Sequence, residues 1–292
     1  MAGKRSIVVS DETLAPATFR LITAASAGFP LLYRYQPFDH ERLSQLIGEH
    51  ILYFSNPADF NDPWDCRPWF DLDQLADPDG LNRHIQWYET ITRRHRPDIS
   101  EDEICRRSQF FRSNPTLLRD KAIELTAELE SAIHERYRVY CLGSSPDSEL
   151  MWAHYAARHT GICLEFATRN ALFCGALQVS YRQTYPLFDL TADEEEHNLA
   201  VLLTKSTSWS YEGEYRLIAQ EKETANVPDT LVTNNHRLAM PEGALSAVIV
   251  GCLAPEATLE TLRALVRQSR RQIAVKRAMR ARNQYKLTIV EQ

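Results

Sequence analysis

Residues 31–54 consist of short apolar runs separated by polar turns. The runs at 31–35 and 51–54 are predicted strands, because each is rich in Leu, Ile, Tyr and Phe over a short stretch. Between them, Asp39 is placed to cap a short helix at 40–47, whose apolar residues recur at helical spacing. The pattern therefore predicts a strand, a short helix and a second strand at the start of the folded body.

The spacing of apolar residues changes between about 71 and 136. Ser100 and Glu103 have the spacing of a capping box, in which each side chain bonds to the other's backbone N–H at the start of a helix. Apolar residues then recur at helical spacing in a charged segment: Leu118, Ala122, Leu125, Leu129, Ala132 and Ile133. We expect a helical insertion that covers one side of a sheet.

The rest of the chain returns to short apolar runs with helices between them. Strands are predicted at 137–142, 161–166, 178–181, 214–219, 247–250, 273–279 and 285–290, and helices at 149–158, 194–205 and 257–268. Neither an internal repeat nor a linker rich in Gly and Ser divides these elements. The sequence predicts an N-terminal extension at 1–29 and a single α+β domain at 30–292, with a mixed, largely antiparallel sheet.

Composition and charge narrow the class of protein. The 292 residues are 44% hydrophobic and 25% charged, which is typical of a folded globular protein with a sizeable core. Lys and Arg number 33 and Asp and Glu 39, a net charge of −6, so any nucleic-acid site would have to be local. The six cysteines show no C-x-x-C pair, and no apolar run reaches the length of a signal peptide or membrane span. We therefore expect a cytoplasmic protein without a membrane partner.

The densest group of chemically capable side chains lies at 206–217. If residues 212–218 are extended, Glu212, Glu214 and Arg216 share one face, with the two carboxylates about 7 Å apart. Such a pair suits oxocarbenium-ion chemistry, in which one carboxylate stabilises developing positive charge and the other orients or deprotonates a nucleophile. The alternative is a solvated strand face with Glu–Arg pairing.

A second group joins a strand end to the helix that follows it. Ser144 and Ser145 offer hydroxyl and amide groups at the strand tip, and Trp152, His154 and Tyr155 lie on the helix. Aromatic side chains in these positions could sandwich a flat ring such as nicotinamide or a nucleobase. The alternative is a core helix that packs against the sheet.

A charged side chain also stands in the middle of the first predicted strand. Arg34 lies between Tyr33 and Tyr35, and an unpaired buried guanidinium is costly, so Arg34 should face a cleft or a carboxylate such as Glu212 or Glu214. The sequence lacks the spacing of a zinc site, a glycine-rich phosphate loop and a nucleophile elbow, so no metal is expected.

Two other classes of function stay open. A metal-dependent or phosphodiester hydrolase could be built around Asn61, Asp62, Asp65 and His154, although ordinary turn chemistry also explains the first three. A non-catalytic module could instead bind nucleic acid or protein through a basic C-terminal run without acidic residues: Arg267, Arg270, Arg271, Lys276, Arg277, Arg280, Arg282 and Lys286.

An ordered set of motifs resembles a known family. The segments are 32–35, 52–55, 60–65, 151–156, 161–166 and 209–216. Together they resemble the bacterial domain-of-unknown-function family 2971 over roughly residues 31 to 290. That family name implies no activity.

The opening strand, helix and strand also resemble the start of ADP-ribosyltransferase folds. This looser resemblance implies an enzyme that cleaves the nicotinamide–ribose bond of NAD and transfers ADP-ribose to a macromolecule. It implies Glu214 as the catalytic glutamate and Glu212 as its companion. It implies Arg34 for the nicotinamide-ribose or phosphate side and Ser144 or Ser145 for the middle-strand position. Together with the neighbouring groups described above, the candidate NAD-binding residues are Arg34, Tyr35, Ser144, Ser145, Trp152, His154, Tyr155, Trp209 and Arg216. The helical insertion departs from the compact members of that group.

Overall fold

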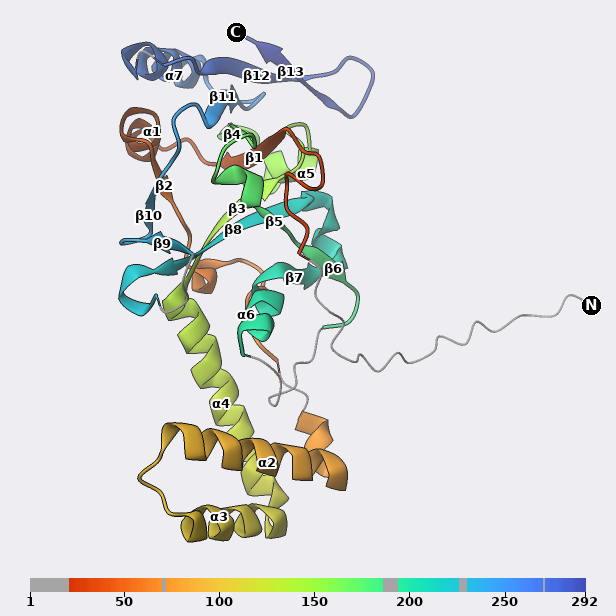
Figure 1. Ribbon diagram of the computed structural model, residues 1–292. Helices are drawn as coiled ribbons and strands as arrows, with labels where there is room; N and C mark the ends of the chain where they lie inside the picture. Colours follow the sequence, from red (N-terminus) through yellow and green to blue (C-terminus); the bar gives the residue numbers. More distant parts are fainter. Residues whose placement is uncertain (1–20, 70–71, 186–193, 226–229, 270) are drawn as a thin grey trace, which may run out of the picture.

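A computed structural model describes residues 21–69, 72–185, 194–225, 230–269 and 271–292 (Figure 1). Its centre is a nine-stranded sheet, most of whose neighbouring strands are antiparallel. In spatial order the strands are β13 (Leu287–Glu291), β12 (Ala274–Arg280), β11 (Leu245–Val250), β4 (Ile162–Ala167), β1 (Leu31–Gln36), β3 (Tyr137–Gly143), β8 (Glu214–Glu221) and β5 (Leu177–Gln178), and β9 (Leu231–Thr233) also pairs with β8. The pairs β11–β12 and β8–β9 are parallel. The fold is α+β with a mixed, largely antiparallel sheet, which confirms the predicted class.

Apolar side chains cover both faces of the sheet. Alternation along β1 places Leu32 in a core shared with α1 (His40–Ser44) and α7 (Glu256–Ser269). Tyr33 and Tyr35 point to the opposite face, where they join Trp152 of α5 (Glu149–His154). The central strands are therefore buried on both sides, which explains why they appear in the sequence as short, almost continuous apolar runs.

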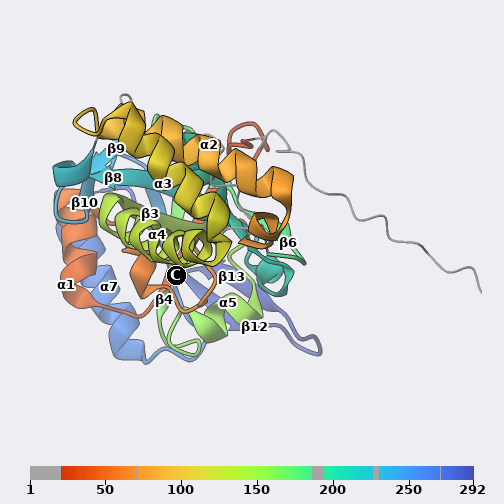
Figure 2. The ribbon, with the colours of Figure 1, turned by 90° about the horizontal axis from the view of Figure 1, so that it is seen from below.

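The insertion forms a helical arm. It consists of α2 (Pro78–His95), α3 (Glu101–Ser113) and α4 (Pro115–Arg136), and α4 leads from the far end of the arm back to β3. Figures 1 and 2 show α2 and α3 packed side by side at the end of α4 that lies away from the sheet. The arm thus projects from the body, and its buried side chains belong to a cluster that also contains Tyr137 and Val139 of β3, so the insertion covers the sheet only at its base. In the described ranges, no helix has the length and apolarity that a membrane span requires.

Two predicted helices end earlier than their patterns suggest. The helix expected at 149–158 ends at His154, because Ala157, Arg158 and His159 adopt left-handed backbone angles with φ of 46°, 55° and 67°. The helix expected at 194–205 is α6 (Glu194–Leu203), and Lys205 lies in β7 (Thr204–Ser206), which pairs with β6 (Ser180–Arg182). Because Lys205 lies in β7 and not at the end of α6, its side chain can reach the buried charge cluster of the candidate site.

The second predicted strand does not pair with the first, although the sequence suggests a unit of strand, short helix and strand. It is β2 (Ile51–Tyr53), which pairs with β10 (Arg237–Ala239) in a separate two-stranded sheet. Residues 21–29 of the expected N-terminal extension contact the body, where Ala24 is buried and Thr23 bridges to Leu177. Residues 1–20 lie outside the described part.

Neighbouring strands separate at the centre of the sheet. β1 pairs with β4 along its whole length, but with β3 only at Tyr33 opposite Gly143. Beyond that point the backbone of Ser55 bonds to Val139 of β3, with N···O distances of 2.9 Å in both directions. β1 and β3 therefore diverge, and the candidate site lies where they do.

Candidate functional site

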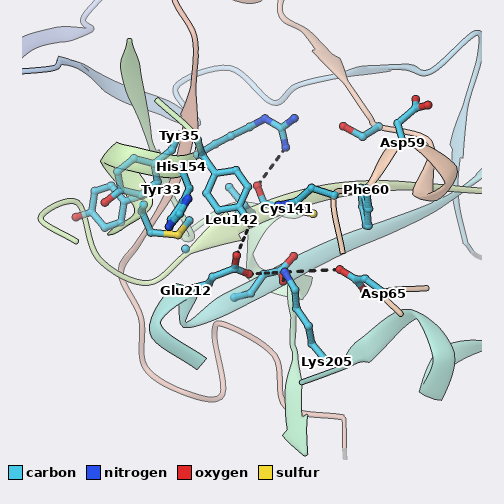
Figure 3. A pocket seen from close by; sticks show the side chains of 17 residues that line it. Tyr33, Tyr35, Asp59, Phe60, Asp65, Cys141, Leu142, His154, Lys205 and Glu212 are labelled. Atoms are coloured by element: carbon cyan, nitrogen blue, oxygen red, sulfur yellow. Dashed lines mark hydrogen bonds and ion pairs between the residues drawn. The ribbon is translucent and has the colours of Figure 1, made fainter. Parts of the chain in front are cut away.

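A pocket of about 350 Å³ opens between β1 and β3. Figure 3 shows Tyr33 and His154 on one side of it and Asp59 and Phe60 on the other. Glu212, Lys205 and Asp65 lie at its floor. A concave space of this size lined by aromatic rings and a few charged groups is typical of a small-molecule site.

The floor of the pocket is a buried cluster of charges. Lys205 Nζ lies 2.5 Å from Glu212, 3.3 Å from Glu214 and 3.6 Å from Asp65. Arg216 forms two-pronged contacts with Glu214, at 2.8 and 3.0 Å, and with Asp65, at 2.9 and 2.7 Å. The five side chains are each at most 5% exposed. With three carboxylates and two cations, the cluster has a formal charge of −1 when all its members are ionised.

Local backbone geometry brings the two glutamates together. Residues 212–218 do not form one continuous strand, because Glu212 ends the 3₁₀ helix Thr207–Glu212 and β8 begins at Glu214. Between them Gly213 has a left-handed φ of 51°, and a Cβ atom there would lie 2.3 Å from the hydroxyl of Ser144. Glycine is favoured at this turn for both reasons. The turn directs both carboxylates toward Lys205, although they do not share one strand face as predicted.

The surroundings give the two glutamates different pKa values. Burial alone would raise the pKa of Glu214, but Arg216 and Lys205 lower it to about 2. Burial and the neighbouring charge of Glu214 raise the pKa of Glu212 above its usual range, against the effect of Lys205. Burial would lower the pKa of Lys205, but the carboxylates of Glu214, Asp65 and Glu212 raise it further than burial lowers it. Glu212 is therefore the carboxylate of this pair that protonates first.

Glu212 also contacts the wall of the pocket that α5 and Tyr155 form. The hydroxyl of Tyr155 donates a hydrogen bond of 2.5 Å to Glu212, from the residue that follows α5. Glu214 is held from behind by Arg216, and its backbone N–H donates to the hydroxyl of Tyr181. The resemblance implies Glu214 as the catalytic glutamate, whereas the geometry leaves Glu212 better placed to act on a ligand.

Arg34 lines the same pocket but does not pair with either glutamate. Its guanidinium donates to the carbonyl oxygen of Cys141 at 3.2 Å and lies 4.2 Å from the centre of the Tyr140 ring. The expected ion pair with Glu212 or Glu214 is therefore not formed. Instead, Arg34 spans the separation between β1 and β3.

Several other predicted site residues line the pocket or lie near it. Tyr35 lines it and donates to the carbonyl oxygen of Ser145 at 2.7 Å, and His154 and Tyr155 line it from the side of α5. The hydroxyl of Ser145 bonds to Asp147, and that of Ser144 lies beside Gly213. The Trp209 ring lies 5.0 Å from Lys205 Nζ.

Two predicted ligand-binding residues are structural. Trp152 is fully buried, donates to the carbonyl oxygen of Pro146 at 2.8 Å and packs edge-on against Tyr35, so it cannot sandwich a ligand ring. Arg216 is also fully buried, behind Glu214 and Asp65, and holds these carboxylates instead of a ligand.

Sequence reasoning missed Lys205 and the way in which Asp65 is used. Lys205 was hidden because the apolar residues before it extend a helical pattern up to Leu203. Asp65 belongs to the motif at 60–65, but nothing in a single sequence indicates that its partner is Arg216, 151 residues later.

The hydrolase alternative does not assemble. Asp62 accepts from the backbone N–H of Trp64 at 3.0 Å, which is a turn contact, and Asp65 is bound to Arg216. His154 lies across the pocket from Asp65 (Figure 3). Within the described ranges, no group of three or more His, Cys, Asp or Glu side chains could hold a metal ion.

The basic C-terminal run is interrupted by acidic partners from other parts of the chain. Lys276 pairs with Glu165 at 2.8 Å, Arg277 with Glu256 at 2.8 Å, and Arg271 lies 3.7 Å from Glu242. Arg270 lies outside the described residues. These pairs reduce the positive charge that the run could offer to a phosphate backbone.

One segment of the chain is similar to a known protein family. The chain has no significant match among the curated proteins or among the solved structures. Residues 151–217 match a family model described as a protein of unknown function, DUF2971. The matched segment contains Tyr155, Lys205, both glutamates and Arg216. Four of the five residues of the charge cluster therefore lie in the segment that is similar to DUF2971, whereas Asp65 and most residues that line the pocket lie outside it.

Proposed function

We propose that this protein cleaves the bond between nicotinamide and ribose in NAD and transfers the ADP-ribose to a macromolecular acceptor. The observation that carries the proposal is the buried charge cluster, with its excess of one negative charge and with Glu212 beside the pocket. When the C–N bond breaks, its electron pair leaves with nicotinamide and the ribose becomes a positively charged oxocarbenium ion. A preorganised negative floor stabilises such a cation more strongly than water does.

The residues around the pocket have complementary roles in this proposal. Tyr33, Tyr35 and His154 provide an aromatic wall for the nicotinamide ring, and Arg34 provides a cation for the phosphate side. Glu212 stabilises the oxocarbenium ion and takes the proton of the acceptor when the new bond to ribose forms. The raised pKa of Glu212 suits the second step, because a carboxylate of ordinary pKa is a weaker base.

Glu214 and Lys205 are positioning residues in this proposal. Glu214 stays ionised because its pKa is near 2, and Lys205 holds the side chain of Glu212 through a hydrogen bond of 2.5 Å. The resemblance to ADP-ribosyltransferase folds supports the choice of NAD. The separation of β1 from β3 supports it as well, since it provides space for a ligand at the centre of the sheet.

The test is incubation of the purified protein with two preparations of NAD, one labelled in nicotinamide and one in the adenine. Released nicotinamide is measured with and without a cell lysate, for the wild type and for Glu212→Gln. We expect release of nicotinamide and retention of the adenine label on macromolecules, and digestion with protease or nuclease then identifies the acceptor class. Absence of nicotinamide release under all these conditions overturns the proposal.

The pH dependence of turnover should follow the ionisation of Glu212. Since burial and Glu214 raise the pKa of Glu212, the acidic limb of the kcat profile should lie above pH 4.5, the ordinary value for a glutamate. The hydroxyl of Tyr155 stabilises the ionised form, so Tyr155→Phe should move this limb to higher pH. The position of the acidic limb is measured from the rate of nicotinamide release between about pH 4 and about pH 9, for the wild type and for Tyr155→Phe. A limb that is unmoved in Tyr155→Phe would exclude Glu212 as the titrating group.

A further inference from the structure

A second pocket of about 350 Å³ lies on the other side of the Arg34 guanidinium. It is bounded by β1, by the start of α1 and by the two-stranded sheet of β2 and β10. Arg34 lines both pockets, whereas Arg42 and Arg237 line only the second. Arg34 is therefore the side chain that the two pockets share.

The second pocket has an excess of positive charge. Arg34, Arg42 and Arg237 face two carboxylates, Asp39 and Glu41. Asp39 is already engaged as the cap of α1, where it accepts from the N–H of Arg42 at 3.1 Å and lies 3.7 Å from the Arg42 guanidinium. Among the residues that the structure describes, neither Arg34 nor Arg237 forms an ion pair with a carboxylate. Two guanidinium groups are thus available to an anion.

Aromatic rings hold two of these arginines in place. The Arg34 guanidinium lies 4.2 Å from the centre of the Tyr140 ring, and that of Arg42 lies 4.7 Å from the centre of the Tyr53 ring. Tyr53 is itself stacked on His236, with ring centres 5.3 Å apart, and is paired across the strands with Arg237. A guanidinium that contacts a ring through its face keeps its N–H groups at the edge for oxygen acceptors. The arrangement is suited to phosphate oxygens, which arginine binds in a two-pronged manner.

We infer that the second pocket binds the diphosphate of the dinucleotide, with Arg34, Arg42 and Arg237 as its ligands. This inference rests on the proposed function, because it divides one NAD molecule between the two pockets. The nicotinamide riboside portion occupies the pocket above Glu212, and the adenosine diphosphate portion extends past Arg34. The second pocket would then distinguish a dinucleotide from nicotinamide riboside.

Direct binding measurements test this inference without requiring turnover. ADP-ribose and nicotinamide riboside are titrated by calorimetry into the wild type, Arg237→Ala and Arg42→Ala, with Arg280→Ala as the control. Arg237 and Arg280 are both exposed on strands, and Arg280 lines neither pocket. We expect each pocket variant to weaken ADP-ribose binding about tenfold or more, because a charge-assisted hydrogen bond is lost. Nicotinamide riboside binding and the control should be unchanged.

Two results separate this inference from the proposed function. ADP-ribose binding that depends on Arg237, in a protein that releases no nicotinamide, keeps the diphosphate pocket and overturns the proposed reaction. Cleavage of NAD with the same KM in the wild type, Arg42→Ala and Arg237→Ala overturns the diphosphate pocket and keeps the reaction. Failure of the wild type to bind ADP-ribose also overturns the pocket.

Discussion

Replacing Glu212 with Gln should lower the rate of nicotinamide release about 100- to 10,000-fold. Gln keeps the size of the side chain but cannot carry the charge that stabilises the oxocarbenium ion or accept the proton of the acceptor. The fold should persist, because Gln has nearly the same size and its amide oxygen can still accept hydrogen bonds from Lys205 and Tyr155. The loss should appear in kcat, with KM for NAD changed little.

The matched control for this experiment is Glu149→Gln. Glu149 is an exposed glutamate at the start of α5, close in sequence to the pocket but outside its lining. This variant should release nicotinamide at the wild-type rate, and both variants should melt within a few degrees of the wild type. Full activity in Glu212→Gln together with loss in Glu214→Gln would return the catalytic role to Glu214.

Replacing Arg216 with Met should lower the free energy of unfolding by about 3–5 kcal/mol. Arg216 is fully buried and is bound to both Asp65 and Glu214, so its removal leaves the three buried carboxylates of the cluster with Lys205 as their only cation. Uncompensated buried charge is costly because the carboxylates cannot recover their hydration. Denaturant unfolding followed by circular dichroism measures the change.

A rescue variant shows whether charge or packing causes this loss. Arg216→Met combined with Asp65→Asn and Glu214→Gln removes the two uncompensated charges and should recover part of the stability. Arg280→Met, on the exposed end of β12, should leave the unfolding free energy within about 0.5 kcal/mol of the wild type. An Arg216→Met protein as stable as the wild type would mean that the cluster relaxes or takes up water when the guanidinium is removed.

Elements with strong local signals could be predicted from the sequence. β3 and β4 are apolar runs buried on both faces, and Ser100 caps α3 through its bond to the N–H of Glu103 as the capping box predicted. β9 and β10, of three residues each, were missed because neither lies in an apolar run like the one that contains β2. Short strands of this kind depend on pairing partners that lie far away in the sequence.

The candidate site was predictable in part. The motif around Glu212 and Glu214 and the position of Arg34 in a strand both pointed to the pocket, because a charged side chain within a strand is costly to bury unless it faces a cleft or an opposite charge. The neighbours of these charges could not be predicted. Lys205 reaches the cluster only because α6 ends at Leu203, and Glu212 turns toward Lys205 only because Gly213 adopts a left-handed angle. Each of these two contacts depends on the residue at which a helix ends, and helix ends are hard to predict from a sequence.

The long sequence separation between Asp65 and Arg216 has a consequence for the synthesis of the protein. Several residues that line the pocket, from Tyr33 to Asp65, lie early in the sequence. Arg216, which binds Asp65 at the floor of the pocket, lies 151 residues after it. A growing chain that has not yet reached β8 therefore lacks Glu214 and the guanidinium of Arg216 that holds it. The buried charge cluster therefore cannot form until most of the chain has left the ribosome.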